Sequence, residues 1–163
     1  MRSKDEGTRT LAELFDGRSQ LIVYHFMHGP NTPEGCLGCT FATDSFDGSV
    51  PHLNAHDVTF VLASRSPLET LNAYKRRMGW SIPWVSSGGT DFNRDFSAWT
   101  EEDRRNGTGS NFGSPGGAWV DVVNDQELMG LSATRARPRG GPVATTSTMT
   151  GERQRDRPCR PRL

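Results

Sequence analysis

An apolar run at residues 21–27 (LIVYHFM), followed nine residues later by two cysteines three positions apart, is the pattern that most constrains this chain. A nearly continuous apolar run predicts a strand buried on both faces of a parallel or mixed sheet. The Gly- and Pro-containing segment 28–35 (HGPNTPEG) then predicts a loop. Cys36 and Cys39 therefore fall at the junction between a central strand and the helix that follows it.

A thiol pair at such a junction can close into a small disulfide and reopen. If a helix begins at Cys36, its unpaired N–H groups and positive dipole end stabilise a thiolate there. We expect this to lower the thiol pKa from about 8.5 to as low as roughly 3.5–7.5. Cys36 would then be the nucleophile, and Cys39 would resolve the mixed disulfide. A C-x-x-C in this setting is typical of a thioredoxin-like redox protein.

The same cysteines allow a second interpretation, a metal-binding module. Cys36, Cys39 and His28 would supply three soft or borderline ligands for zinc or Cu(I). His25 or solvent would complete the set, although a histidine inside an apolar strand is more simply a hydrogen-bonded core residue. No cofactor is predicted under the redox interpretation.

Two further histidines, His52 and His56, have the spacing that places metal ligands on one helix face. Pro51 and a helix end near Asp57 argue against such a site. The Gly-rich segment 113–117 lacks the lysine and preceding strand of a phosphate loop and indicates a linker. Trp80 and Trp84 either wall the redox site or anchor the core, and Arg76 and Arg77 suit a helix C-terminus.

The remaining pattern predicts an α/β fold. We expect a helix at 10–15, a helix after Cys39 that breaks near 48–51, and strands at 58–64, 82–86 and 118–123. A capping box at Ser66–Glu69 predicts the start of another helix, and Gly79 its end. Strands alternating with helices predict a mainly parallel sheet with right-handed crossovers, flanked by helices.

Charge divides the chain unevenly. From residue 133 onward there are eight arginines and two acidic residues, so 11 basic and 17 acidic residues precede that point. No apolar run reaches 18 residues, so no membrane span is expected. The N-terminus lacks the apolar core of a secretory signal, which predicts a cytoplasmic protein. Cys159, the third cysteine, has no evident partner.

Several separate segments resemble the DUF899 family, whose members are thioredoxin-like bacterial proteins of unknown function. The likeness is carried by residues 14–27 (LFDGRSQLIVYHFM), 35–39 (GCLGC), 52–55 (HLNA), 74–80 (YKRRMGW), 83–87 (PWVSS) and 91–93 (DFN). The resemblance implies a thioredoxin-like fold and a redox role for Cys36 and Cys39. It implies no particular substrate, so the expected partner is an unidentified dithiol or disulfide protein, or a small thiol.

The likeness is expected to stop at Ala133, where Arg-, Pro- and Thr-rich sequence begins. This predicts an incomplete thioredoxin-like domain at 8–132, truncated or frameshifted, and a disordered basic tail at 133–163. A native tail that binds nucleic acid is the alternative. Nucleic acid is not the expected partner, because the tail has no aromatic residues to stack on bases.

Overall fold

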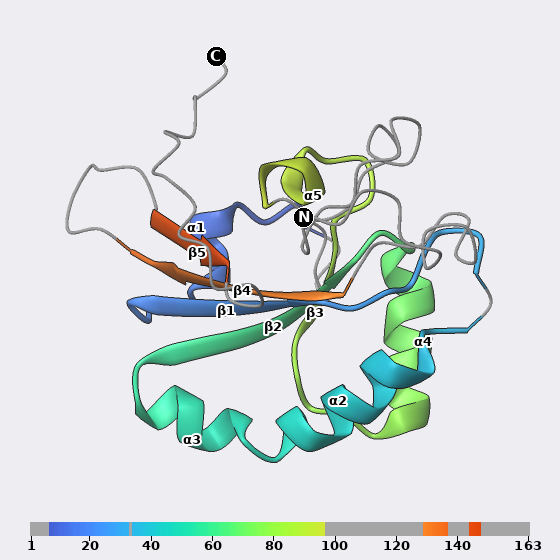
Figure 1. Ribbon diagram of the computed structural model, residues 1–163, viewed down its shortest axis with the longest axis horizontal. Helices are drawn as coiled ribbons and strands as arrows, with labels where there is room; N and C mark the ends of the chain where they lie inside the picture. Colours follow the sequence, from blue (N-terminus) through green and yellow to red (C-terminus); the bar gives the residue numbers. More distant parts are fainter. Residues whose placement is uncertain (1–6, 33, 97–128, 137–143, 148–163) are drawn as a thin grey trace.

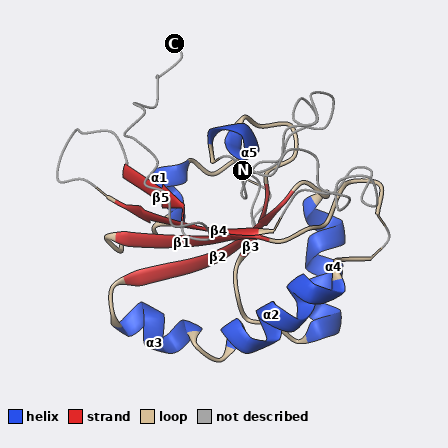
Figure 2. Ribbon diagram, viewed as in Figure 1, coloured by secondary structure: helices blue, strands red, loops and turns tan. Residues whose placement is uncertain are grey.

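The computed structural model describes residues 7–32, 34–96, 129–136 and 144–147. Within them one sheet has the strand order β3-β2-β1-β4-β5 (Figures 1 and 2). Its strands are β1 (Gln20–His25), β2 (Val58–Ser64), β3 (Trp84–Ser86), β4 (Gly130–Arg135) and β5 (Ala144–Ser147). The apolar run that opens the sequence pattern is thus the central strand, as predicted.

Pairing in this sheet is mixed. β1 pairs in parallel with β2, and β2 in parallel with β3. On its other side β1 pairs antiparallel with β4, and β4 antiparallel with β5. The prediction of a mainly parallel sheet therefore holds only for the three strands joined by helical crossovers, since β4 and β5 run against their neighbours.

Helices cover both faces of the sheet, as Figure 1 shows. The helices α2 (Leu37–Asp47), α3 (Val50–Ala55) and α4 (Leu68–Met78) lie on one face, while α1 (Leu11–Leu14) and α5 (Phe92–Asp95) lie on the other. Side chains alternate along β1, so Leu21 and Val23 join the core under α1 and α5. Tyr24 and Phe26 join the larger, aromatic core against α2 and α4.

Local chain chemistry explains most helix ends. The predicted break near 48–51 is present, because α2 ends at Asp47 and α3 begins at Val50 with Pro51 in its first turn. Gly79 ends α4 in a left-handed conformation (φ 74°), as expected for glycine there. The capping box predicted at Ser66–Glu69 is wrong: the N-cap of α4 is Pro67, with no side-chain cap. The Ser66 hydroxyl is instead engaged by His28.

Strand structure extends beyond residue 132, where the end of the domain was predicted. β4 continues to Arg135, and β5 lies within the segment predicted to be a disordered tail. The boundary does not hold at these residues because their main chains pair with the sheet: β4 adds to β1, and β5 adds to β4. The strand predicted at 118–123 lies outside the described residues.

Among the helices described here, none combines the length and apolar character that crossing a membrane requires.

Candidate functional site

Cys36 is the N-cap residue of α2, at the point where the chain returns from the loop after β1. Its N–H donates to the Met27 carbonyl at 3.1 Å, which fixes the cysteine beside the end of the central strand. Its own carbonyl accepts from the Thr40 N–H and from Thr40 Oγ1, each at 2.9 Å. The thiol is partly exposed and is not in a disulfide. The predicted helix start at Cys36 is therefore confirmed to within one residue.

Cys39 lies one turn into α2 and is fully buried, also as a free thiol. Burial raises the pKa of this thiol well above its ordinary value of 9.0. The Met27 main chain and the Tyr24 side chain act on this pKa in the opposite direction, and the nearby Cys36 thiol raises it further. The pair thus consists of one accessible and one buried thiol that interact with each other.

Tyr24 was not singled out by the sequence pattern, although its side chain faces both cysteines. Its hydroxyl is buried and has no hydrogen-bond partner of regular geometry among the described residues. Burial, followed by the Cys39 thiol and then Cys36, raises the pKa of this phenol above its ordinary value. A tyrosine inside an apolar strand that leads to a C-x-x-C was the available signal, because its hydroxyl needs a partner.

His28 is fully buried, but it is held away from the metal arrangement proposed from sequence. Its Nδ1 lies 2.8 Å from the Ser66 hydroxyl, and its ring meets those of Tyr74 and Trp84 edge-on. Burial lowers its pKa. Within the described residues, no three His, Cys, Asp or Glu side chains are grouped closely enough to hold a metal ion. The set Cys36, Cys39 and His28 is therefore not brought together.

Of the other histidines, His25 has the core role that sequence favoured, and His52 and His56 do not share one helix. His25 is buried, with its Nε2 2.9 Å from the Ser132 hydroxyl and its ring stacked on Phe92 at 5.6 Å. His52 lies in α3, whereas His56 is already the C-cap of that helix, and both are exposed. The helix thus ends before the second histidine, as Pro51 and Asp57 suggested.

The loop before Cys36 is fastened to α4. Arg77 forms a two-pronged pair with the Glu34 carboxylate, with Nη1 at 3.0 Å from Oε1, and its guanidinium lies 4.5 Å from the centre of the Tyr74 ring. Trp80 and Trp84 are buried in the aromatic core against Phe26, so they serve as core anchors. These contacts fix the entry to the C-x-x-C segment.

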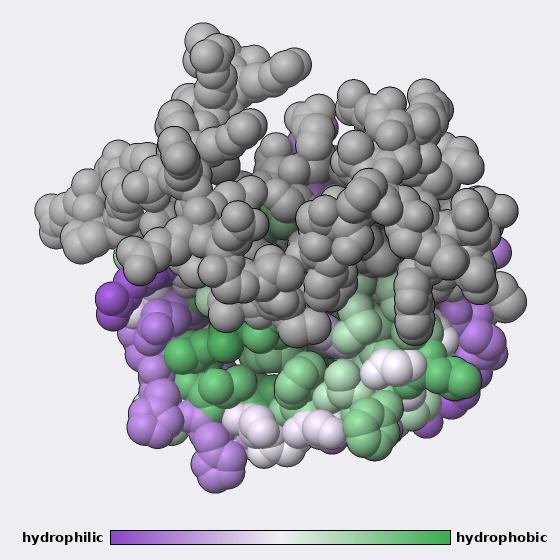
Figure 3. Space-filling model, viewed as in Figure 1, coloured by the Kyte–Doolittle hydropathy of each residue, from purple (hydrophilic) through white to green (hydrophobic). Residues whose placement is uncertain are grey.

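The surface beside Cys36 is apolar. Leu37 is 85% exposed and Phe41 is 77% exposed, and both belong to α2 on the turn that carries Cys36 and the turn after it. Figure 3 shows hydrophobic side chains over α2 along the lower edge of the face in view. We call Leu37 and Phe41 the α2 apolar surface.

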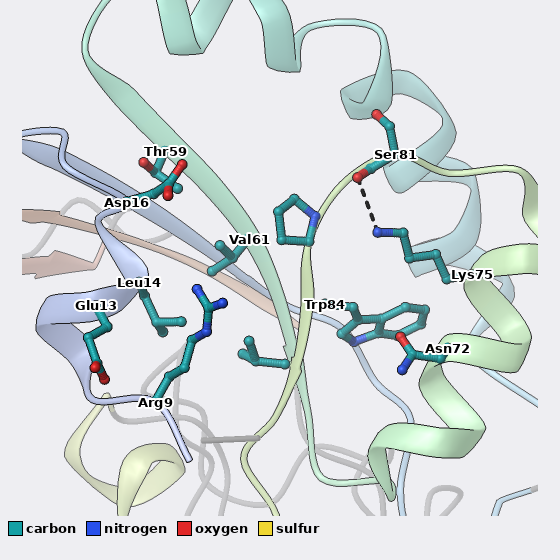
Figure 4. A pocket seen from close by; sticks show the side chains of 12 residues that line it. Arg9, Glu13, Leu14, Asp16, Thr59, Val61, Asn72, Lys75, Ser81 and Trp84 are labelled. Carbon is teal, nitrogen blue, oxygen red and sulfur yellow. Dashed lines mark hydrogen bonds between the residues drawn. The ribbon is translucent and has the colours of Figure 1, made fainter. Parts of the chain in front are cut away.

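A cavity of about 320 Å³ lies elsewhere, between α1, the β2–β3 edge of the sheet and α4 (Figure 4). Arg9 and Lys75 enter it from opposite sides, and Lys75 Nζ donates to the Ser81 carbonyl at 3.1 Å. Neither Cys36 nor Cys39 lines it. Cys36 is thus partly exposed at the start of α2 and is not part of this cavity.

Comparison with known protein families identifies the family to which this chain belongs. The family model described as a bacterial protein of unknown function (DUF899) matches residues 3–155. The chain belongs to this family. The DUF899 match continues well past residue 132, so the predicted end of the likeness at Ala133 is wrong. A search of curated proteins finds no match.

Solved structures similar to this DUF899 chain are thioredoxin-fold peroxiredoxins. The bacterioferritin comigratory protein of Xanthomonas campestris, studied for alkyl peroxide reduction, is 16% identical, with a TM-score of 0.54, over 91% of this chain and 78% of that one. Peroxiredoxin Q of the same organism is 15% identical, with a TM-score of 0.55, over 91% of this chain and 79% of that one. Peroxidoxin BcpB of Mycobacterium tuberculosis is 12% identical, with a TM-score of 0.52, over 83% of this chain and 71% of that one. The predicted thioredoxin-like fold is confirmed.

Proposed function

We propose that this DUF899 protein is a thiol–disulfide oxidoreductase in which Cys36 attacks and Cys39 resolves. The observation that carries the proposal is the pairing of a partly exposed thiol at the N-cap of α2 with a buried thiol that interacts with it. An accessible sulfur can meet a substrate, and a neighbouring buried sulfur can complete the exchange without leaving the protein. The thioredoxin-like fold is consistent with this chemistry.

The reaction balances in two exchanges. The Cys36 thiolate attacks one sulfur of a substrate disulfide, so that a mixed disulfide forms and the first substrate thiolate leaves. The Cys39 thiolate then attacks Cys36 Sγ, which forms the Cys36–Cys39 disulfide and releases the second substrate thiolate. The two departing thiolates take up the two protons that the cysteines lose. The protein dithiol is oxidised, and the substrate disulfide is reduced to two thiols.

Two single substitutions test this assignment. Cys36→Ser should abolish reduction of a disulfide, whereas Cys39→Ser should still react once and accumulate a mixed disulfide visible by mass spectrometry. Iodoacetamide at pH 6 should label the partly exposed Cys36 at the N-cap of α2 faster than it labels a free cysteine. Equal labelling rates, or full turnover by Cys36→Ser, would contradict the proposal.

The α2 apolar surface supports a protein substrate over a small charged thiol. Leu37 and Phe41 are large apolar side chains left exposed next to the attacking sulfur. Burying this apolar area against a partner would stabilise the complex between the two proteins. We therefore infer a disulfide flanked by apolar side chains on a partner protein as the substrate class.

Reduction of a peroxide is a second candidate, favoured by the likeness to peroxiredoxins. The Cys36 thiolate would take one oxygen from the peroxide to become a sulfenic acid while an alkoxide leaves and is protonated. The Cys39 thiol would then condense with it to give the same disulfide and water. Consumption of cumene hydroperoxide faster than reduction of a protein disulfide would favour this candidate over the first.

A further inference from the structure

Cys39 presents a difficulty for the proposed exchange. The resolving step needs a thiolate at residue 39, yet this side chain is fully buried, and burial raises its pKa. A sulfur anion in apolar surroundings requires hydrogen-bond donors that are already in place. The groups that lower the Cys39 pKa, and so favour its anion, are the Met27 main chain and the Tyr24 side chain.

Tyr24 and Cys39 are buried in the same aromatic core. Tyr24 lies in the central strand, and its ring packs edge-to-face on Phe26 and Phe46, with ring centres at 6.5 and 5.4 Å. Its hydroxyl is buried and lacks a partner of regular geometry within the described part of the chain. Leaving a buried hydroxyl unpaired lowers stability, so the position is poorly explained by packing alone.

Resting on the proposed function, we propose that Tyr24 is a catalytic residue that donates its hydroxyl hydrogen bond to Cys39 Sγ in the resolving step. The donor stabilises the negative charge on Cys39 before it attacks Cys36 Sγ. Tyr24 keeps its own proton throughout. The proton of the Cys39 thiol goes to solvent and then to the departing substrate thiolate, so the exchange stays balanced.

The protonation state of Tyr24 fits this role. Burial, followed by the adjacent thiols, raises its pKa, so the phenol is a neutral donor at physiological pH. Charge-assisted hydrogen bonds are about twice as strong as neutral ones. The hydrogen bond from the Tyr24 hydroxyl therefore becomes strong only when Cys39 is an anion. The exchange must pass through this anion.

The test uses the full chain with Cys159→Ser, so that two thiols remain, and the disulfide probe 5,5′-dithiobis(2-nitrobenzoate). Attack by Cys36 releases one coloured thiolate, and resolution by Cys39 releases a second. Tyr24→Phe keeps the ring and removes the donor. It should leave the rate of the first release unchanged and slow the second about ten-fold or more, since a hydrogen bond to a charged group contributes about that factor. The pH midpoint of the second release should also move upward.

Tyr74→Phe is the matched control, because it removes a hydroxyl that bonds to Thr40 Oγ1 at 2.9 Å and that is not among the groups that shift the Cys39 pKa. It should leave the second release unchanged. Thermal melting supplies an independent readout: Tyr24→Phe should melt at the same or a higher temperature, since it removes an unpaired buried hydroxyl.

The outcomes separate the two proposals. An absent first release would overturn the oxidoreductase assignment itself. A normal first release with an unchanged second release in Tyr24→Phe would overturn only the role of Tyr24. Loss of folding in Tyr24→Phe would also overturn it, because the hydroxyl would then be needed for structure.

Discussion

Gly35 lies so close to Phe26 that a β-carbon at residue 35 would be 2.7 Å from Phe26 Cε1, and it would also be 3.2 Å from Tyr74 Cζ. Both rings belong to the aromatic core and cannot retreat easily. We predict that Gly35→Ala lowers the free energy of unfolding by about 1–3 kcal/mol, the usual cost of overpacking. It should also slow the first thiol exchange, because the displaced residue precedes Cys36. Urea unfolding and probe kinetics measure the two effects.

Gly48→Ala is the control for this substitution. Gly48 ends α2 with a right-handed backbone (φ −65°), and a β-carbon there would meet no atom within 4 Å. Replacing it should leave stability unchanged or raise it by up to about 1 kcal/mol, because alanine restricts the unfolded chain. Equal destabilisation by both substitutions would show that the contact with Phe26 is not the cause.

The parallel half of the fold could be predicted from sequence because its signals are local. The apolar runs at β1 and β2, the break between α2 and α3, and the glycine that ends α4 each follow from nearby residues. The antiparallel half could not, because the pairing of β4 with β1 joins residues more than a hundred positions apart. Composition alone gave no indication that residues 144–147 would form β5 and pair with β4.

The candidate site shows the same division. The position of Cys36 at a helix start follows from the strand and loop that precede it. The capping box predicted at Ser66 was wrong because serine before a helix usually caps it. Here the Ser66 hydroxyl instead contacts His28, in a loop 38 positions away. Tyr24 was missed for a related reason: its role depends on which buried group a strand residue faces, and spacing does not give this.

The α2 apolar surface gives a prediction about substrate choice. Leu37→Ser and Phe41→Ser, singly or together, should lower kcat/KM for a protein disulfide such as insulin, by about ten-fold for the pair. They remove apolar area that a partner would bury. The same variants should react normally with the small probe used above, and their stability should change by less than about 0.5 kcal/mol. Ser45→Ala, exposed one turn further along α2, is the control. Equal losses on insulin and on the small probe would contradict a docking role.

The last prediction concerns His25 and the pH dependence of stability. Burial lowers the pKa of His25 from 6.5 to about 4 in the folded protein. Between these values the unfolded chain binds more protons than the folded one, so stability falls as the pH drops through this window. We predict a loss of about 2 kcal/mol between pH 7.5 and pH 5 from this residue. His25→Gln keeps a polar group near Ser132 but cannot titrate, so it should be less stable at neutral pH yet lose about 2 kcal/mol less on acidification. Urea unfolding at both pH values measures the difference, and parallel pH dependence in the two proteins would show that His25 does not determine it.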